Sequence, residues 1–90
     1  MSNYNGWANY ETWRVGLEII NDMTLEDFGF DVEVEPYDLA EAMKSHVQDH
    51  IEETTEPGFA RDYAMAFLDN VSWRELANHM IQDAKKDAKQ

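Results

Sequence analysis

The sequence contains no cysteine, which excludes disulfide bonds, thiol chemistry and zinc–thiolate sites. Basic residues are also scarce: seven Lys and Arg stand against nineteen Asp and Glu, and the net charge is −12. Because phosphate backbones are bound by clusters of Lys and Arg, direct nucleic-acid binding is not expected. No apolar run approaches the roughly 20 residues that a membrane span needs, and no signal peptide is visible. We therefore expect a cytoplasmic protein with no membrane partner.

What is present fits one small folded domain. The chain has 90 residues, of which 43% are hydrophobic and 12% aromatic, too apolar for a disordered acidic tail. Residues 1–8 are polar and predict an N-terminal arm, and residues 85–90 predict a frayed tail. Between them we expect a mainly α fold, a compact bundle of about four helices with one short strand or extended segment.

The central stretch, residues 36–53, predicts one long amphipathic helix. Its apolar residues recur at spacings of three and four and share one face: Leu39, Ala40, Met43, Val47 and Ile51. Its carboxylates fall on the opposite face: Asp38, Glu41, Asp49 and Glu52. Pro36 suits the first helical turn, where its missing N–H costs nothing. The predicted helix is about 27 Å long, with an apolar side and an acidic side.

Three further helices are predicted. The first covers residues 9–20, with Asn9 as its cap and Gly16 permitting close approach by another helix. The others cover residues 59–69 and 72–84, the last beginning with a Ser72-x-x-Glu75 capping box. Tyr10, Trp13, Leu17 and Ile20 would line one face of the first helix, and Phe59, Tyr63, Ala66 and Phe67 one side of the third. The residues expected to be largely buried are Trp7, Trp13, Leu17, Leu39, Met43, Val47, Phe67, Trp73, Leu76 and Met80.

The region between the first two helices is less regular. Thr24 with Asp27 three residues later predicts one capped helical turn, and Gly29 would end it. Residues 30–35 alternate apolar and acidic side chains, the period of a short strand. A lone strand needs a partner. It would pair with the N-terminal arm or with its copy in a dimer, or form an extended segment packed over helices.

The charge is concentrated in one segment. Residues 18–56 hold thirteen acidic residues and one base, Lys44, and so carry the whole net charge; the remainder has six of each sign. The natural partners of such a surface are cations or basic proteins, including proteins that bind nucleic acid. Carboxylates one helical turn apart lie roughly 5–6 Å from each other and would imitate the phosphates of DNA. A solvated face that keeps a small protein soluble is the alternative. The partner-binding candidates are Asp31, Glu33, Glu35, Asp38, Glu41, Asp49, Glu52 and Glu56.

Other chemistry has weaker support. His46 and His50, four residues apart, would share a helix face and could bind zinc or nickel with Asp49 or Glu53. The favoured interpretation is that they are two polar residues at the edge of an apolar face. No nucleophile or nucleotide-binding motif is present, so we expect no enzyme, cofactor or metal. The last two helices weakly suggest a helix-turn-helix. A dimerisation module using residues 30–34 or exposed aromatics is a further alternative.

The N-terminal run Asn5-Gly6-Trp7-Ala8-Asn9-Tyr10-Glu11-Thr12-Trp13 resembles a family of small proteins from phages, plasmids and bacteria that is marked by an NYETW signature. Residues 38–43, DLAEAM, and residues 71–77, VSWRELA, are similar to two further segments of that family, and residues 21–35 are least like it. The resemblance implies a domain of unknown function from a mobile element and supplies no mechanism. In charge and size the chain also resembles DNA mimics that block restriction enzymes or CRISPR complexes. The leading hypothesis is therefore an anti-restriction or anti-CRISPR inhibitor that binds a basic nucleic-acid-binding protein or defence complex in the host cytoplasm.

Overall fold

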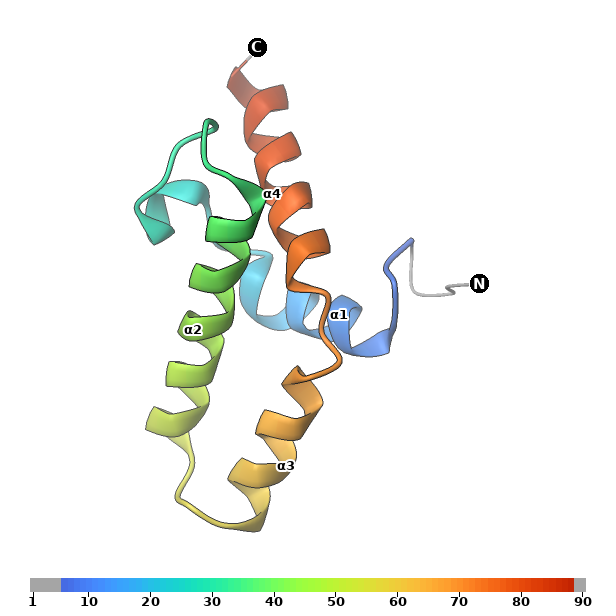
Figure 1. Cartoon of the computed structure of the whole chain (residues 1–90), viewed down its shortest axis with the longest axis vertical. Coiled ribbons are helices and arrows are strands. Elements are labelled where there is room, and N and C mark those ends of the chain that lie inside the picture. The colour runs from blue at the N-terminus through green and yellow to red at the C-terminus, as the bar shows by residue number, and fades with distance from the viewer. Residues whose placement is uncertain (1–5, 89–90) are drawn as a thin grey trace.

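The chain folds into four α-helices joined by short helical turns and loops. A computed structural model describes residues 6–88. The helices are α1 (Tyr10–Val15), α2 (Pro36–Thr54), α3 (Phe59–Leu68) and α4 (Trp73–Ala88), with a π-helical turn η1 (Gly16–Ile20) and a 3-10 turn η2 (Leu25–Phe28). α2 runs antiparallel to α3 and α4 and packs mainly against α4 (Figure 1). The predicted mainly α bundle is confirmed, and α4 continues through the segment predicted to fray as far as residue 88.

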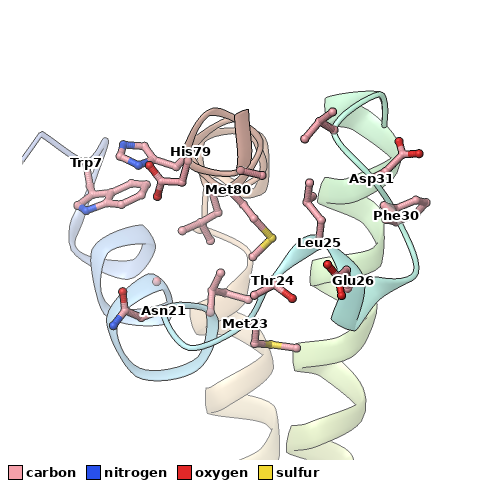
Figure 2. Close-up of a pocket in the computed structure, with 16 residues that line it drawn as sticks. Trp7, Asn21, Met23, Thr24, Leu25, Glu26, Phe30, Asp31, His79 and Met80 are labelled. Carbon is pink, nitrogen blue, oxygen red and sulfur yellow. The ribbon is translucent and has the colours of Figure 1, made fainter. Parts of the chain in front are cut away.

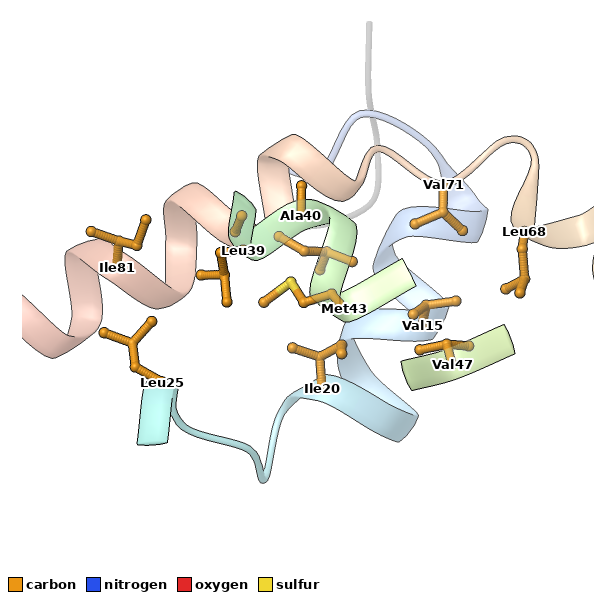
Figure 3. Packing of buried hydrophobic residues seen from close by; sticks show 12 residues of the cluster. Val15, Ile20, Leu25, Leu39, Ala40, Met43, Val47, Leu68, Val71 and Ile81 are labelled. Atoms are coloured by element: carbon orange, nitrogen blue, oxygen red, sulfur yellow. The ribbon is translucent and has the colours of Figure 1, made fainter. Parts of the chain in front are cut away.

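The core lies between α2 and α4. Leu39, Met43 and Val47 of α2 are completely buried, and the same cluster includes Leu76 and Ile81 of α4. Figure 3 shows Val15, Ile20 and Leu25 of the preceding segments packed into it as well. The three α2 residues belong to the apolar stripe that the periodicity of α2 predicts. Burying each such side chain contributes about 1.5–3 kcal/mol, so this face stabilises the fold more than helix propensity does. No helix in the described part of the chain is long and apolar enough to cross a membrane.

The first helix begins as predicted but turns a different face inward. Asn9 is the N-cap, and its side-chain oxygen accepts a hydrogen bond from the Thr12 N–H at 2.9 Å. The buried residues are Thr12 and Val15, followed by Ile20 in η1, whereas Leu17 is 53% exposed.

The prediction that Leu17 is buried is wrong because the helix contacts α4 through Gly16. A Cβ atom at Gly16 would lie 2.9 Å from Leu76 Cδ2, so the glycine permits the close approach that the sequence predicted. The next residue, Leu17, is rotated about 100° away from that contact. Tyr10 is also exposed.

Residues 30–35 form a loop rather than a strand, and residues 6–88 contain no strand or sheet. Val34 donates its N–H to the Asp31 carbonyl at 3.1 Å, and Glu33 donates its N–H to Asp31 Oδ1 at 2.9 Å. The predicted alternation nevertheless holds, because Phe30, Val32 and Val34 are half-buried while the acidic residues face solvent. Among the three alternatives predicted for residues 30–35, the structure shows the last one, a segment that packs over helices.

The short turn before this loop follows its sequence signals. Thr24 donates its N–H to the Asp27 carboxylate at 2.8 Å, which forms the predicted cap of η2. Gly29 then ends the turn with a φ of 80°, in the left-handed region that favours glycine.

The capping box predicted for α4 is replaced by contacts with the N-terminal region. Ser72 donates its N–H to Thr12 Oγ1 at 2.7 Å, and the Glu75 carboxylate accepts the Ala8 N–H at 2.9 Å. Asn9 adds a third link, donating its side-chain N–H to the Asn70 carbonyl at 2.7 Å. We call these three links the α1–α4 junction. They hold the first helix against the start of the last one.

Two aromatic residues of α3 lie outside the core. Phe59 is 84% exposed and Tyr63 is 68% exposed, and their rings contact each other with centroids 6.0 Å apart. The helix buries Leu68 and half-buries Phe67 at its other end, nearer α1. Phe59 follows directly after the α2–α3 loop, at the end of the molecule away from the α2–α4 core (Figure 1).

Candidate functional site

The eight predicted partner-binding residues lie on α2 and on the two loops that flank it. Four occupy the solvent face of α2, three precede it and one follows it, and every one of these side chains is exposed. The helix residues are Asp38, Glu41, Asp49 and Glu52, and the loop residues are Asp31, Glu33, Glu35 and Glu56. We refer to these eight residues as the acidic surface.

On α2 the acidic surface consists of two pairs rather than a continuous row. Asp38 and Glu41 are three residues apart, as are Asp49 and Glu52, which places the members of each pair roughly 5–6 Å apart at Cβ. The pairs are separated by about 16 Å along the helix axis. Ser45, which is exposed and uncharged, lies between them on the same face. Each pair therefore presents two adjacent negative charges. The uncharged Ser45 separates the pairs on this face, and Lys44, three residues after Glu41, lies beside it on the helix.

The loop before α2 adds charge in a fixed backbone conformation. Asp31 uses one carboxylate oxygen to accept the Glu33 N–H, and Glu35 occupies the N-cap position of α2. The helix dipole favours negative charge at this end, so Glu35 and Asp38 also stabilise the first turn of the helix.

Few cations neutralise these carboxylates. In the part of the chain that the structure describes, the ion pair is Arg14 Nε with Glu18 Oε2 at 2.9 Å, outside the acidic surface. The hydrogen bond that Arg14 donates to the Glu18 carboxylate raises the pKa of Arg14 above its ordinary value. Because both side chains are exposed, this pair contributes little to stability. The acidic surface itself thus faces solvent without a paired base among residues 6–88.

Arg61 lies close to one end of the acidic surface, but its hydrogen bonds go to two backbone carbonyls and the Thr55 hydroxyl rather than to a carboxylate. Its Nη2 atom donates to the Glu52 carbonyl at 2.6 Å and to the Thr55 carbonyl at 2.5 Å. These bonds satisfy carbonyl groups at the C-terminus of α2 and tie α2 to α3. The sequence analysis missed this role because Arg61 follows α2 by seven residues and belongs to the next helix.

The histidines do not assemble a metal site among the described residues. No group of three or more His, Asp or Glu side chains there has a metal-binding arrangement. His46 is exposed and its ring contacts Phe28 edge-on, with centroids 5.7 Å apart. His79, on α4, contacts Trp7 with ring centroids 4.3 Å apart. Both rings therefore have aromatic neighbours that account for their positions.

Comparisons with known proteins place the chain without assigning a function to it. No curated protein matches it, and no solved structure matches it. A family model described as "Family of unknown function (DUF7249)" matches residues 1–88. The match covers nearly all of the 90 residues, and the domain of unknown function that the sequence implied is thereby confirmed. The chain belongs to the DUF7249 family.

Proposed function

We propose that this protein binds and inhibits a basic, nucleic-acid-handling host protein by imitating DNA with its acidic surface. The target would be a host defence complex, of the CRISPR or restriction type, and the protein itself a product of a phage or plasmid acting in the host cytoplasm. The observation that carries the proposal is the solvent face of α2. Its carboxylates are exposed and in pairs, and no ion pair involving them is found among the described residues, where Arg61 is bound to backbone carbonyls at the end of the helix.

The charge arrangement suits a channel that normally holds nucleic acid. Such a channel is lined with Lys and Arg, which a rigid array of carboxylates satisfies as phosphates do. A net charge of −12 also steers a basic partner toward the protein at long range. The helix fixes the backbone that carries the carboxylate pairs, so little conformational freedom of the backbone is lost on binding. Inhibition then follows from occupation of the channel, and no catalytic step by this protein is required.

The test begins with capture of a partner from host lysate on the tagged protein, followed by washing at increasing salt. The proposal expects a nucleic-acid-binding protein or complex that dissociates as salt screens the charges, and that DNA displaces. Capture of a partner that is indifferent to salt and to DNA would overturn the proposed mimicry.

Variants then locate the contact. Glu41→Lys/Asp49→Lys reverses two exposed carboxylates of α2 and should weaken partner binding by about tenfold or more. Asp62→Lys/Asp69→Lys makes the same change in net charge at exposed positions on and just after α3, and serves as the matched control. If both double variants bind equally, net charge rather than the acidic surface determines binding and the assignment of the site is wrong.

A second candidate function is a protein–protein interaction or dimerisation module without DNA mimicry. The observation that favours it is the exposed aromatic pair Phe59 and Tyr63 at the start of α3. Exposed aromatic residues are enriched at interfaces. This function predicts concentration-dependent dimers by sedimentation, or salt-insensitive partner binding, and loss of either in Phe59→Ser/Tyr63→Ser. A monomer at all concentrations whose partner binding ignores that change would exclude it.

A further inference from the structure

A groove of about 650 Å³ lies beside α4, on a part of the surface that the sequence analysis did not single out. Its volume is within the range of about 300–1,000 Å³ that is typical of ligand sites. Figure 2 shows Trp7 and His79 at one end and Phe30 and Asp31 at the other, with Met80, Leu25 and Met23 between them. The groove is therefore elongated, which fits an extended or helical peptide better than a compact molecule.

The floor of the groove is apolar and adaptable. Ile20 and Leu25 are buried, while Met23, Phe30 and Met80 are half-buried and packed against the core. Methionine is flexible and polarisable, and it is over-represented at surfaces that receive varied apolar side chains. Contact with an apolar side chain would remove this surface from water, and each buried aliphatic side chain is worth about 1.5–3 kcal/mol.

The rim of the groove is negative on opposite sides. Glu26 and Asp31 come from η2 and the following loop, and Asp83 comes from α4. All three side chains are exposed, and no Lys or Arg lines the groove in the described part of the chain. Three carboxylates around an apolar floor repel an anionic ligand and favour a cationic one.

We propose that this groove binds a basic amphipathic segment of the partner protein, with apolar side chains on the floor and Lys or Arg against Glu26, Asp31 and Asp83. The inference rests on the proposed function only for the basic character of the partner. It adds that binding has an apolar anchor, so part of the affinity persists at high salt. Asp31 belongs both to the groove and to the acidic surface, so the two contacts adjoin each other.

The probe for this site is a synthetic basic peptide with Leu at positions i, i+4 and i+7 and Lys elsewhere, which forms one apolar helix face. The protein carries ¹³C in its methionine methyl groups, and NMR follows each methyl during the titration. We expect shifts at Met23 and Met80, which line the groove, and none at Met65 on α3. A peptide of equal charge with Ser in place of Leu should bind about tenfold more weakly or worse.

Two variants on α4 test the floor and the rim separately. Ala84→Phe fills the groove, and Ala66→Phe on α3 is its control. Asp83→Lys reverses one of the charges on the rim, and Asp69→Lys, just after α3, is its control. We expect the two α4 variants to lose peptide binding and the two control variants to retain it. The proposal is wrong if the Ser peptide binds as well as the Leu peptide, if the shifts avoid Met23 and Met80, or if no peptide binds.

The result of the peptide titration can be distinguished from the result of the test of the proposed function. If the groove is the peptide site, Glu41→Lys/Asp49→Lys retains the methionine shifts, whatever it does to the captured partner. Groove binding with no effect of this double variant on the partner would refute the mimicry alone. Loss of partner binding in the double variant, with no methionine shifts in the wild-type protein, would refute the groove alone.

Discussion

The α1–α4 junction and the acidic surface use polar side chains in opposite ways. At the junction, Thr12 is completely buried, and its hydroxyl donates to Asn9 Oδ1 and accepts the Ser72 N–H. On the acidic surface the carboxylates are charged, exposed and without a paired base among the described residues. Buried polar groups are stabilising only when their hydrogen bonds are satisfied, whereas exposed charges need no partner to be tolerated.

The difference indicates which residues hold the fold together and which remain free to bind. Asn9 and Thr12, within the run that resembles a family signature, act in the structure as a helix cap and as an interhelical link. These two residues of the run are thus explained by folding. The carboxylates of α2 make no comparable contribution to packing, which leaves them available for the partner that we propose.

The largest expected effect is on the buried face of α2. Met43→Ala removes a completely buried side chain between α2 and α4 and should lower the free energy of unfolding by about 2–5 kcal/mol. Urea denaturation measures the change. Ser45→Ala, at an exposed position on the same helix, is the control and should change stability by less than about 0.5 kcal/mol. Similar losses in both variants would mean that α2 does not pack as described.

The junction should be the next most sensitive region. Thr12→Val keeps the shape of the side chain but leaves the Ser72 N–H without its acceptor, at a cost of about 1–3 kcal/mol. Thermal unfolding checks this value. Thr24→Val, at an exposed position that caps η2, should cost less. If Thr12→Val leaves the stability unchanged, the hydroxyl does not support the junction.

The C-terminus of α2 should show a smaller effect. Arg61→Lys keeps the positive charge but cannot place donors in the same planar arrangement on the Glu52 and Thr55 carbonyls. We expect a loss of about 1 kcal/mol in chemical denaturation. Arg14→Lys, in an exposed ion pair, is the control and should be neutral. Equal behaviour of the two variants would argue that charge alone matters at position 61.

The smallest effect on stability should come from the acidic surface. Glu41→Lys/Asp49→Lys should change the free energy of unfolding by no more than about 0.5 kcal/mol, or raise it slightly by reducing repulsion. Calorimetry at low and high salt tests this prediction. A large loss of stability at either salt concentration would show that these carboxylates contribute to folding, and any effect of the variant on binding would then need a different interpretation.

Sequence periodicity predicted the element that dominates the core. The stripe on α2 is long and regular, so the burial of Leu39, Met43 and Val47 could be predicted directly from the sequence. The caps at Asn9 and Thr24 and the close approach at Gly16 were equally local signals. The exposed positions of the acidic surface followed from the same periodicity, but its function stays a proposal.

What the sequence could not give depends on contacts between distant segments. Leu17 and Phe59 have the right character for a core, and their exposure is decided by how the first helical region docks on α4 and by where α3 begins. The Ser72-x-x-Glu75 pattern is a capping box only if no stronger partner is near, and Thr12 and Ala8 provide such partners. The groove is lined by Trp7, by residues between 16 and 32 and by residues of α4, so no single stretch of sequence indicates it.

The α1–α4 junction has a consequence for the order in which the chain folds. Its hydrogen bonds join residues that are 60, 61 and 67 positions apart, so forming it closes most of the chain into one loop. The α2–α3 contact is local and needs little loop closure. Since distant contacts form only after that entropy has been lost, we expect α1 to dock last and to detach first. Its amides should then exchange with solvent through a partial opening, before those of α2 and α4.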